Sequence, residues 1–141
     1  MNATNQPKPK RRWCQVRPWT VLLGLLVLSG CGPSKEQQAV DAYNRGVVYG
    51  KKGDRDKEIA EYTEAIRLQP DFADAYYNRG VAYRGTGATD KAIADYTEAV
   101  RLKPDFADAY YNRAVDYGST GDKAKAEADF AKAKELGYKP E

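Results

Sequence analysis

Apolar and small residues recur every three or four positions over most of the chain, which is the spacing of an α-helix with one buried face. The pattern is clear in residues 89–102, where Ala92, Ile93, Tyr96 and Val100 fall on one side. Six such stretches follow one another, and they are separated by Gly, Pro and Asp. We therefore predict six helices, at 35–51, 55–68, 72–85, 89–102, 106–119 and 123–136.

Residues that favour helix ends stand at the borders of these stretches. Ser34 precedes the first helix and could form a capping box with Gln37, in which each side chain accepts or donates at the other's backbone. Asp71 and Asp105 stand just before the third and fifth helices, and we expect their carboxylates to accept the free N–H groups there. Glycines permit the turns between paired helices.

The pattern of helices repeats every 34 residues. The sequence DFADAYYNR begins at Asp71 and again at Asp105. With alanines as first positions, the repeat divides the chain into three units, 39–72, 73–106 and 107–140. A fixed period of this length indicates a solenoid, in which each helix pair buries its apolar face against its neighbours.

A 34-residue unit of two helices with small and aromatic residues in this order resembles the tetratricopeptide repeat, and the resemblance covers residues 39–140. In the second unit the family's positions hold Tyr76, Gly80, Tyr83, Ala92, Tyr96, Ala99 and Pro104. The first unit departs from the pattern at Ala42 and Glu58, and the third has Tyr138 where proline is expected. The resemblance implies an all-α solenoid of three helix-turn-helix units, which we expect to be monomeric.

The last predicted helix differs from the earlier second helices of the units. Glu127 and Lys134 stand where the second unit has Ile93 and Val100. Terminal repeats need a polar outer face. We therefore expect Glu127 and Lys134 to face water and the array to end with this helix.

Two charge ladders accompany the repeat. Arginines recur at 34-residue intervals, and an acidic residue follows each of them by 16 positions; the pairs are Arg45 and Glu61, Arg79 and Asp95, and Arg113 and Asp129. We expect a structural role, in which the arginine stems cover the helix interface and their heads pair with the acids.

The first 30 residues differ from the rest of the chain. Five basic residues and no acidic one precede an apolar run at 21–28, and Leu28, Ser29, Gly30 and Cys31 follow. This order is the layout of a signal peptide, and the uncharged stretch 18–29 is shorter than the roughly 20 residues of a spanning helix. Leu-Ser-Gly-Cys resembles the lipobox of bacterial lipoproteins, which implies cleavage before Cys31 and acylation of its thiol. An uncleaved anchor and retention in the cytoplasm are the alternatives.

These features give an expected organisation and location. Residues 1–30 form the signal peptide, 31–38 hold the lipidated Cys31, a short tether and the start of the first helix, and 39–140 form the repeats. Because Gly32 and not aspartate follows the cysteine, the resemblance implies the outer membrane of a double-membraned bacterium, facing the periplasm. We expect a lipid-anchored protein of the bacterial cell envelope.

Composition narrows the classes of function. Processing would remove five of the 23 basic side chains and no acidic one, so the net charge would change from +3 to −2. The basic balance therefore belongs to the leader, and nucleic-acid binding loses its support. The chain has no histidine, and its one cysteine after processing would carry lipid. We therefore expect neither an enzyme nor a metal site, and no cofactor.

In tetratricopeptide arrays the first helix of each unit lines the concave side. The resemblance therefore assigns a peptide-binding groove to Tyr43, Asn44, Asp74, Tyr77, Asn78, Arg84, Asp108, Tyr111 and Asn112, with Val47, Val81 and Val115 among them. Adjacent helical side chains point about 100° apart, so we expect that Tyr76 and Tyr77 do not both enter the same core. The resemblance gives Tyr76 and Tyr110 the family's packing position, which leaves Tyr77 and Tyr111 for the groove. The alternative is that these tyrosines and asparagines serve ordinary packing.

The groove positions also bear on the partner. Some members of the family bind a terminal carboxylate with Lys and Arg, but the matching positions here hold Tyr43, Val47, Asn78, Asp108 and Asn112. We expect no such clamp, and a neutral or basic peptide segment of another protein as the ligand. The predicted function is a membrane-anchored protein–protein interaction adaptor. The alternatives are a structural subunit that packs in an envelope complex without a groove ligand, and glycan binding.

Overall fold

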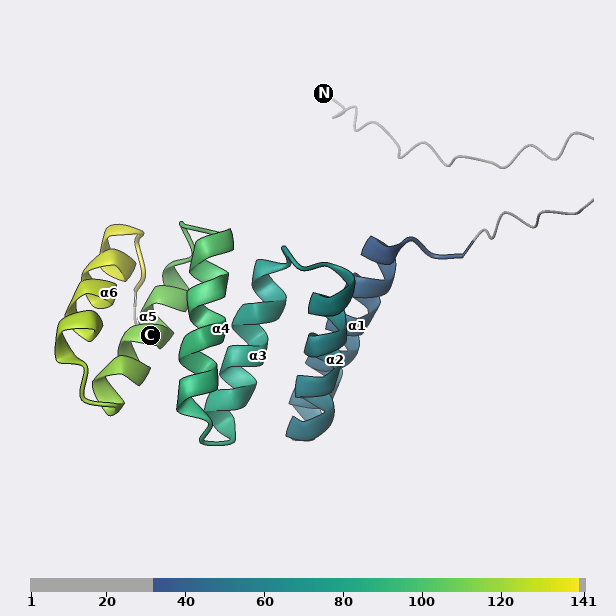
Figure 1. The fold of residues 1–141 in the computed structure, drawn as a ribbon, viewed down its shortest axis with the longest axis horizontal. Helices are drawn as coiled ribbons and strands as arrows, with labels where there is room; N and C mark the ends of the chain where they lie inside the picture. Colours follow the sequence, from purple (N-terminus) through teal and green to yellow (C-terminus); the bar gives the residue numbers. More distant parts are fainter. Residues whose placement is uncertain (1–31, 140–141) are drawn as a thin grey trace, which may run out of the picture. The chain divides into compact units, whose positions relative to one another are not determined.

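The computed structural model describes residues 32–139. The helices are α1 (Lys35–Lys52), α2 (Arg55–Leu68), α3 (Ala73–Gly85), α4 (Thr89–Leu102), α5 (Ala107–Ser119) and α6 (Lys123–Glu135) (Figure 1). No strand occurs between residues 32 and 139. The predicted all-α class and the six predicted helices are confirmed, and every helix end lies within one residue of its prediction. The leader and Cys31 lie outside the described residues, so cleavage and acylation stay predictions.

The helices form a row of three antiparallel pairs (Figure 1). Within each pair the two helices pack along each other, and α2 packs on α3 as α4 packs on α5. Each pair therefore covers its apolar face with the pair before or after it, as a solenoid requires.

Glycine makes the turn inside each pair possible. Gly53, Gly87 and Gly121 have φ of 77°, 80° and 89°, a left-handed conformation that glycine adopts without the steric cost of a Cβ atom. This confirms the prediction that glycines permit these turns.

The N-terminal cap of α1 is formed by one side chain. Ser34 Oγ accepts a hydrogen bond from the backbone N–H of Gln37 at 3.2 Å. The Gln37 amide donates to Asp41 at 3.0 Å instead of turning back to Ser34. The predicted capping box is thus half formed, and the cap itself is confirmed.

The predicted caps at Asp71 and Asp105 are wrong. The residues at the N-terminal ends of α3 and α5 are Phe72 and Phe106, and neither end has a side-chain capping bond. The physical reason is tertiary packing: the Phe72 ring centroid lies 5.0 Å from that of Tyr43. The position before the helix is therefore occupied by an aromatic ring that packs in the core and not by a side chain that caps the helix.

The core consists of small residues around two tyrosine rings. The buried alanines are Ala39, Ala42, Ala65, Ala75, Ala82, Ala92, Ala99, Ala109, Ala114, Ala126 and Ala133. Tyr62 and Tyr96 are buried among them. A Cβ atom built on Gly80 would lie 2.7 Å from the Tyr96 ring, and one on Gly46 would lie 2.6 Å from the Tyr62 ring. The glycines therefore let the paired helices approach closely enough to enclose the rings.

The outer face of α6 is polar. Glu127 and Lys134 are exposed, whereas Ile93 is half-buried and Val100 is buried. This confirms the predicted exposure of the two charged residues.

The arginine ladder connects neighbouring pairs. Arg79 of α3 donates through Nε and Nη2 to both oxygens of Asp95 on α4, each at 2.8 Å, and through Nη1 to Thr63 on α2 at 3.1 Å. Arg113 makes the corresponding bonds to Asp129 and Thr97. Each of these arginines links three helices, which confirms the structural role predicted for the ladder.

Candidate functional site

A hydrogen-bonded ladder joins the first helices of consecutive pairs. The Asn78 amide on α3 donates to the Tyr43 hydroxyl on α1 at 2.7 Å. The Asn112 amide on α5 donates to the Tyr77 hydroxyl on α3 at 2.9 Å. We call these four residues the Tyr–Asn ladder; they were predicted groove residues, and they are bonded to one another.

The rings of the predicted groove tyrosines are packed. The Tyr77 centroid lies 4.7 Å from Phe106 and 5.9 Å from Tyr96. Tyr111 stacks on Tyr138 at 4.1 Å with an interplanar angle of 19°. Burial raises the pKa of the Tyr77 hydroxyl, and the nearby carboxylate of Asp108 raises it further.

The prediction that Tyr76 and Tyr110 pack is confirmed, but the expected contrast with Tyr77 is wrong, because Tyr77 packs in the same core. Tyr76 and Tyr77 are both half-buried, and both pack against the cluster of Ala99, Val100 and Ala109. The reason is that α3 has neighbours on several sides, so two side chains that point about 100° apart can each meet a different helix. Whether Tyr77 and Tyr111 also contact a ligand stays a prediction.

The two ends of the tyrosine and asparagine rows lack this pairing. Asn44 on α1 is exposed, and Tyr111 on α5 is half-buried. The structure thus brings together Tyr43 with Asn78 and Tyr77 with Asn112, and it places Asn44 away from these bonds.

Arg84 belongs to a cluster that sequence reasoning missed. Its Nη1 donates to Asn112 Oδ1 at 3.2 Å, and its Nε lies 3.1 Å from Asp116 Oδ1. Asp116 is buried, and burial raises the pKa of its carboxyl while Arg84 lowers it. The sequence signal was a break in the repeat, since an acid stands where the earlier units have Val48 and Ala82.

The open face of the first helices carries valines and carboxylates. On α3, Asp74 and Val81 are seven residues apart and therefore lie on one side of the helix, with Asn78 between them. Asp74 is half-buried, and Val81 is 38% exposed. On α5, Asp108 is exposed and Val115 is half-buried. This face offers aliphatic surface beside negative charge.

On α1 the corresponding residues are Val40, Asn44 and Val47. Val40 is exposed and Val47 is half-buried. A valine here replaces the carboxylate found on α3 and α5, so the negative charge is confined to the second and third pairs.

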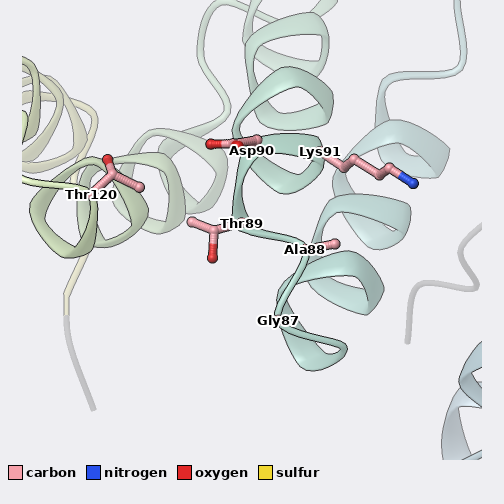
Figure 2. A pocket seen from close by; sticks show the side chains of 6 residues that line it. All are labelled: Gly87, Ala88, Thr89, Asp90, Lys91 and Thr120. Carbon is pink, nitrogen blue, oxygen red and sulfur yellow. The ribbon is translucent and has the colours of Figure 1, made fainter.

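A shallow hollow lies elsewhere, at the turn between α3 and α4. Its lining is Gly87, Ala88, Thr89, Asp90, Lys91 and Thr120 (Figure 2). Thr89 and Asp90 lie on the side of Thr120, and Lys91 extends away from it (Figure 2). None of the predicted groove residues lines this hollow.

Residues 32–139 contain neither a side-chain cluster suited to a metal ion nor a helix suited to span a membrane. In this range no group of three or more Cys, Asp or Glu side chains is arranged to hold a metal ion. Of the helices that the structure describes, none is long and apolar enough to cross a membrane.

Comparison with solved structures supports the fold. The first TPR of Spaghetti (RPAP3) bound to HSP90 peptide SRMEEVD is 26% identical with a TM-score of 0.71, over 74% of this chain and 82% of that chain. The TPR2B-domain:pHsp70-complex of yeast Sti1 is 29% identical with a TM-score of 0.68, over 70% of this chain and 79% of that chain. MamA is 31% identical with a TM-score of 0.70. The match covers 73% of this chain and 60% of the MamA chain.

Comparison with protein families identifies the repeat. Residues 73–106 and 107–136 match the tetratricopeptide repeat, and residues 48–87 match the TPR repeat. No curated protein sequence matches the chain. The repeat matches run without a gap from residue 48 to residue 136, and the chain therefore belongs to the tetratricopeptide repeat family.

Proposed function

We propose that this chain is a lipid-anchored adaptor of the bacterial cell envelope that binds a peptide segment of another protein on the open face of α1, α3 and α5. The observation that carries the proposal is the regular face itself, where equivalent side chains recur on three parallel helices. Two similar structures are complexes with an HSP90 peptide and with pHsp70, which supports a peptide ligand.

The packing of the first helices suits this role. The Tyr–Asn ladder fixes α1, α3 and α5 to one another through bonds of 2.7 and 2.9 Å. A surface that is already ordered loses less conformational entropy when it binds. The ladder thus supports binding by holding the open face in place.

The charge of the face favours a neutral or basic segment. The HSP90 peptide in the first structure, SRMEEVD, carries three acidic residues near its end. Asp74 and Asp108 would repel such a sequence from the open face. The partner of this chain therefore differs in charge from that peptide.

The anchor is the finer part of the proposal and rests on residues 28–31. Two or three acyl chains on one protein make membrane binding effectively permanent, whereas one chain gives only marginal binding. Because α1 begins at Lys35, the four residues from Cys31 to Ser34 reach roughly 13 Å at about 3.3 Å per residue. The repeats would then lie close to the bilayer.

Expression of the full chain and of Cys31→Ala in a double-membraned bacterium tests the anchor. We expect the wild-type protein in the outer-membrane fraction, with a mature N-terminus at an acylated Cys31 by mass spectrometry. Cys31→Ala should be released or left unprocessed. A mature protein with an unmodified Cys31 would refute the anchor.

Selection from a phage library of random short peptides tests the ligand. The immobilised full chain should enrich peptides, and Val81→Arg should abolish their capture. Ala94→Arg is the matched control, because Ala94 is exposed on the second helix of the same pair, α4. Equal loss of capture in both variants would place the binding surface elsewhere.

A further inference from the structure

Most polar groups of the open face are already engaged within the protein. The Asn78 and Asn112 amides donate to tyrosine hydroxyls. Arg84 is held by Asn112 and by the buried carboxylate of Asp116. Asn78, Asn112 and Arg84 are therefore not free recognition groups of this face.

Several side chains of the face remain open to a partner, and five of them carry its aliphatic surface and negative charge. They form what we call the Val–Asp stripe, which consists of Val47, Val81, Val115, Asp74 and Asp108. Within one helix the carboxylate and the valine are seven residues apart, or about 10.5 Å along the axis at a rise of about 1.5 Å per residue. The stripe thus has an acidic edge and an aliphatic edge.

The charge of the acidic edge is poorly compensated. The cation nearest to Asp74 is Lys103, at 3.9 Å, and both side chains are about half exposed. Asp108 is exposed and takes part in no ion pair with another described residue. The residue that corresponds to Lys103 in the third unit is Gly137, which brings no charge. The positive charge of Arg84 is offset by Asp116.

We propose that the Val–Asp stripe recognises a peptide segment in which a basic residue lies within about three positions of an aliphatic residue. The aliphatic side chain covers Val81 and Val115, and the Lys or Arg side chain pairs with Asp74 or Asp108. Three extended residues span about 10 Å, which matches the separation of the two edges. This inference rests on the proposed peptide-binding function and gives its ligand a chemistry.

The physical basis is complementarity of both edges at once. Aliphatic contact removes apolar surface from water, and a carboxylate forms short, strong hydrogen bonds with Arg or Lys. An acidic segment would gain the aliphatic contact but would face two carboxylates, of which only Asp74 has a cation of the described residues within 4.0 Å. The stripe therefore discriminates by repulsion as well as by attraction.

The test compares peptide selection on the full chain with selection on a charge-reversed variant, Asp74→Lys with Asp108→Lys. The same phage library of random short peptides serves both. We expect wild-type protein to enrich sequences with Lys or Arg near Val, Ile or Leu. The reversed variant should enrich acidic residues at the same place.

A synthetic copy of one enriched peptide then gives the magnitude. Asp74→Asn with Asp108→Asn should weaken its binding at least about tenfold at low salt, and the difference should shrink as salt screens the charges. Asp56→Asn with Asp90→Asn is the matched control, because these two exposed carboxylates occupy equivalent positions on α2 and α4. The control should leave the affinity unchanged.

The outcomes separate this inference from the proposed function. Peptides enriched without a charge preference, or acidic peptides enriched by the wild-type chain, would overturn the recognition rule and leave peptide binding standing. Equal loss of affinity in the control variant would also overturn it. Enrichment of no peptide at all would overturn both the rule and the proposed function.

Discussion

The interior of the array and its ends use the same repeat positions in opposite ways. Tyr96 on α4 is 0% exposed, whereas Phe130 at the corresponding position of α6 is 40% exposed. Val100 is buried, and Lys134 at its equivalent is exposed. The difference is that α4 has α5 packed on it, while α6 has no following helix within the described range. A repeat position is therefore core or surface according to its neighbour.

The arginine ladder shows the same contrast at the other end. The Arg79 side chain is 16% exposed in its pair with Asp95, but Arg45 is 53% exposed in its pair with Glu61. Arg79 also donates to Thr63 of the preceding pair. Arg45 lies on α1, and no helix precedes α1 in the described part of the chain, so Arg45 has no corresponding contact there. Ion pairs at equivalent repeat positions thus differ in burial because of what lies beside them.

The largest expected difference is between Tyr96→Ala and Phe130→Ala. Removal of the enclosed Tyr96 ring should cost about 3 to 5 kcal/mol, because the closely packed helices can collapse only partly into the cavity. Phe130→Ala should cost less than about 2 kcal/mol, because that ring is partly in water already. Guanidinium unfolding followed by circular dichroism measures both. Equal losses would mean that a partner surface covers α6.

The second expected difference is between Asp95→Ala and Glu61→Ala. Loss of Asp95 leaves the largely buried Arg79 without its partner, which should cost about 3 kcal/mol. Loss of Glu61 breaks an exposed pair and should cost less than about 1 kcal/mol. The same unfolding measurement decides, and a double-mutant cycle with Arg79 isolates the pair. Similar costs at both sites would show that burial does not set the strength of the ladder.

The third expected difference concerns two helical glycines. An added Cβ at Gly80 would meet the Tyr96 ring at 2.7 Å and the Ala92 carbonyl oxygen at 3.3 Å, so Gly80→Ala should cost about 1 to 3 kcal/mol through overpacking. Gly118→Ala meets only Ala126, at 4.0 Å, and should gain up to about 1 kcal/mol in helix propensity. Thermal melts of both variants test this. A Gly80→Ala protein as stable as the wild type would mean that the ring shifts freely.

Much of the fold could be predicted because the same pattern of helices and turns occurs in three successive units. The helix ends recur at a 34-residue period, so a boundary that is unclear in one unit can be inferred from the next, although an error in reading the repeated pattern, as at Asp71 and Asp105, recurs as well. The exposure of Glu127 and Lys134 followed from comparing them with Ile93 and Val100, since a charged residue at an apolar repeat position indicates a missing neighbour.

The site could be predicted only in part, because its details depend on contacts between pairs. The candidate residues do lie on the first helices, but the sequence cannot show that Asn112 donates to Tyr77 across 35 positions. Phe106 occupies the helix end because it packs on Tyr77, and that tertiary contact outweighs the capping preference of Asp105. Asp116 was missed because its role depends on Arg84, from another unit.

The smallest expected effect concerns one repeat position that is buried in both the second and the third unit. This position holds Ala82 on α3 and Asp116 on α5, so only the third unit buries a carboxyl group there. Burial raises the pKa of Asp116 more than Arg84 lowers it, and Asp116 Oδ2 has no hydrogen-bond partner among the described residues. The folded protein therefore holds this proton at pH values where the unfolded chain, with a carboxyl pKa of about 3.9, has lost it.

The stability that Asp116 contributes is fully present below that unfolded pKa and is lost as the pH rises through the higher folded value. Asp116→Asn keeps an oxygen that can accept from Arg84 but cannot ionise, so it should change stability at pH 7 by at most about 1 kcal/mol. The Asp116→Asn protein should also not show the decrease in unfolding free energy that Asp116 causes in the wild type as the pH rises from about 4 to neutral. Unfolding free energies of both proteins across that range measure the effect. Parallel pH profiles for wild type and Asp116→Asn would contradict the assignment, because a carboxyl that titrates alike in the folded and unfolded chains gives no pH dependence.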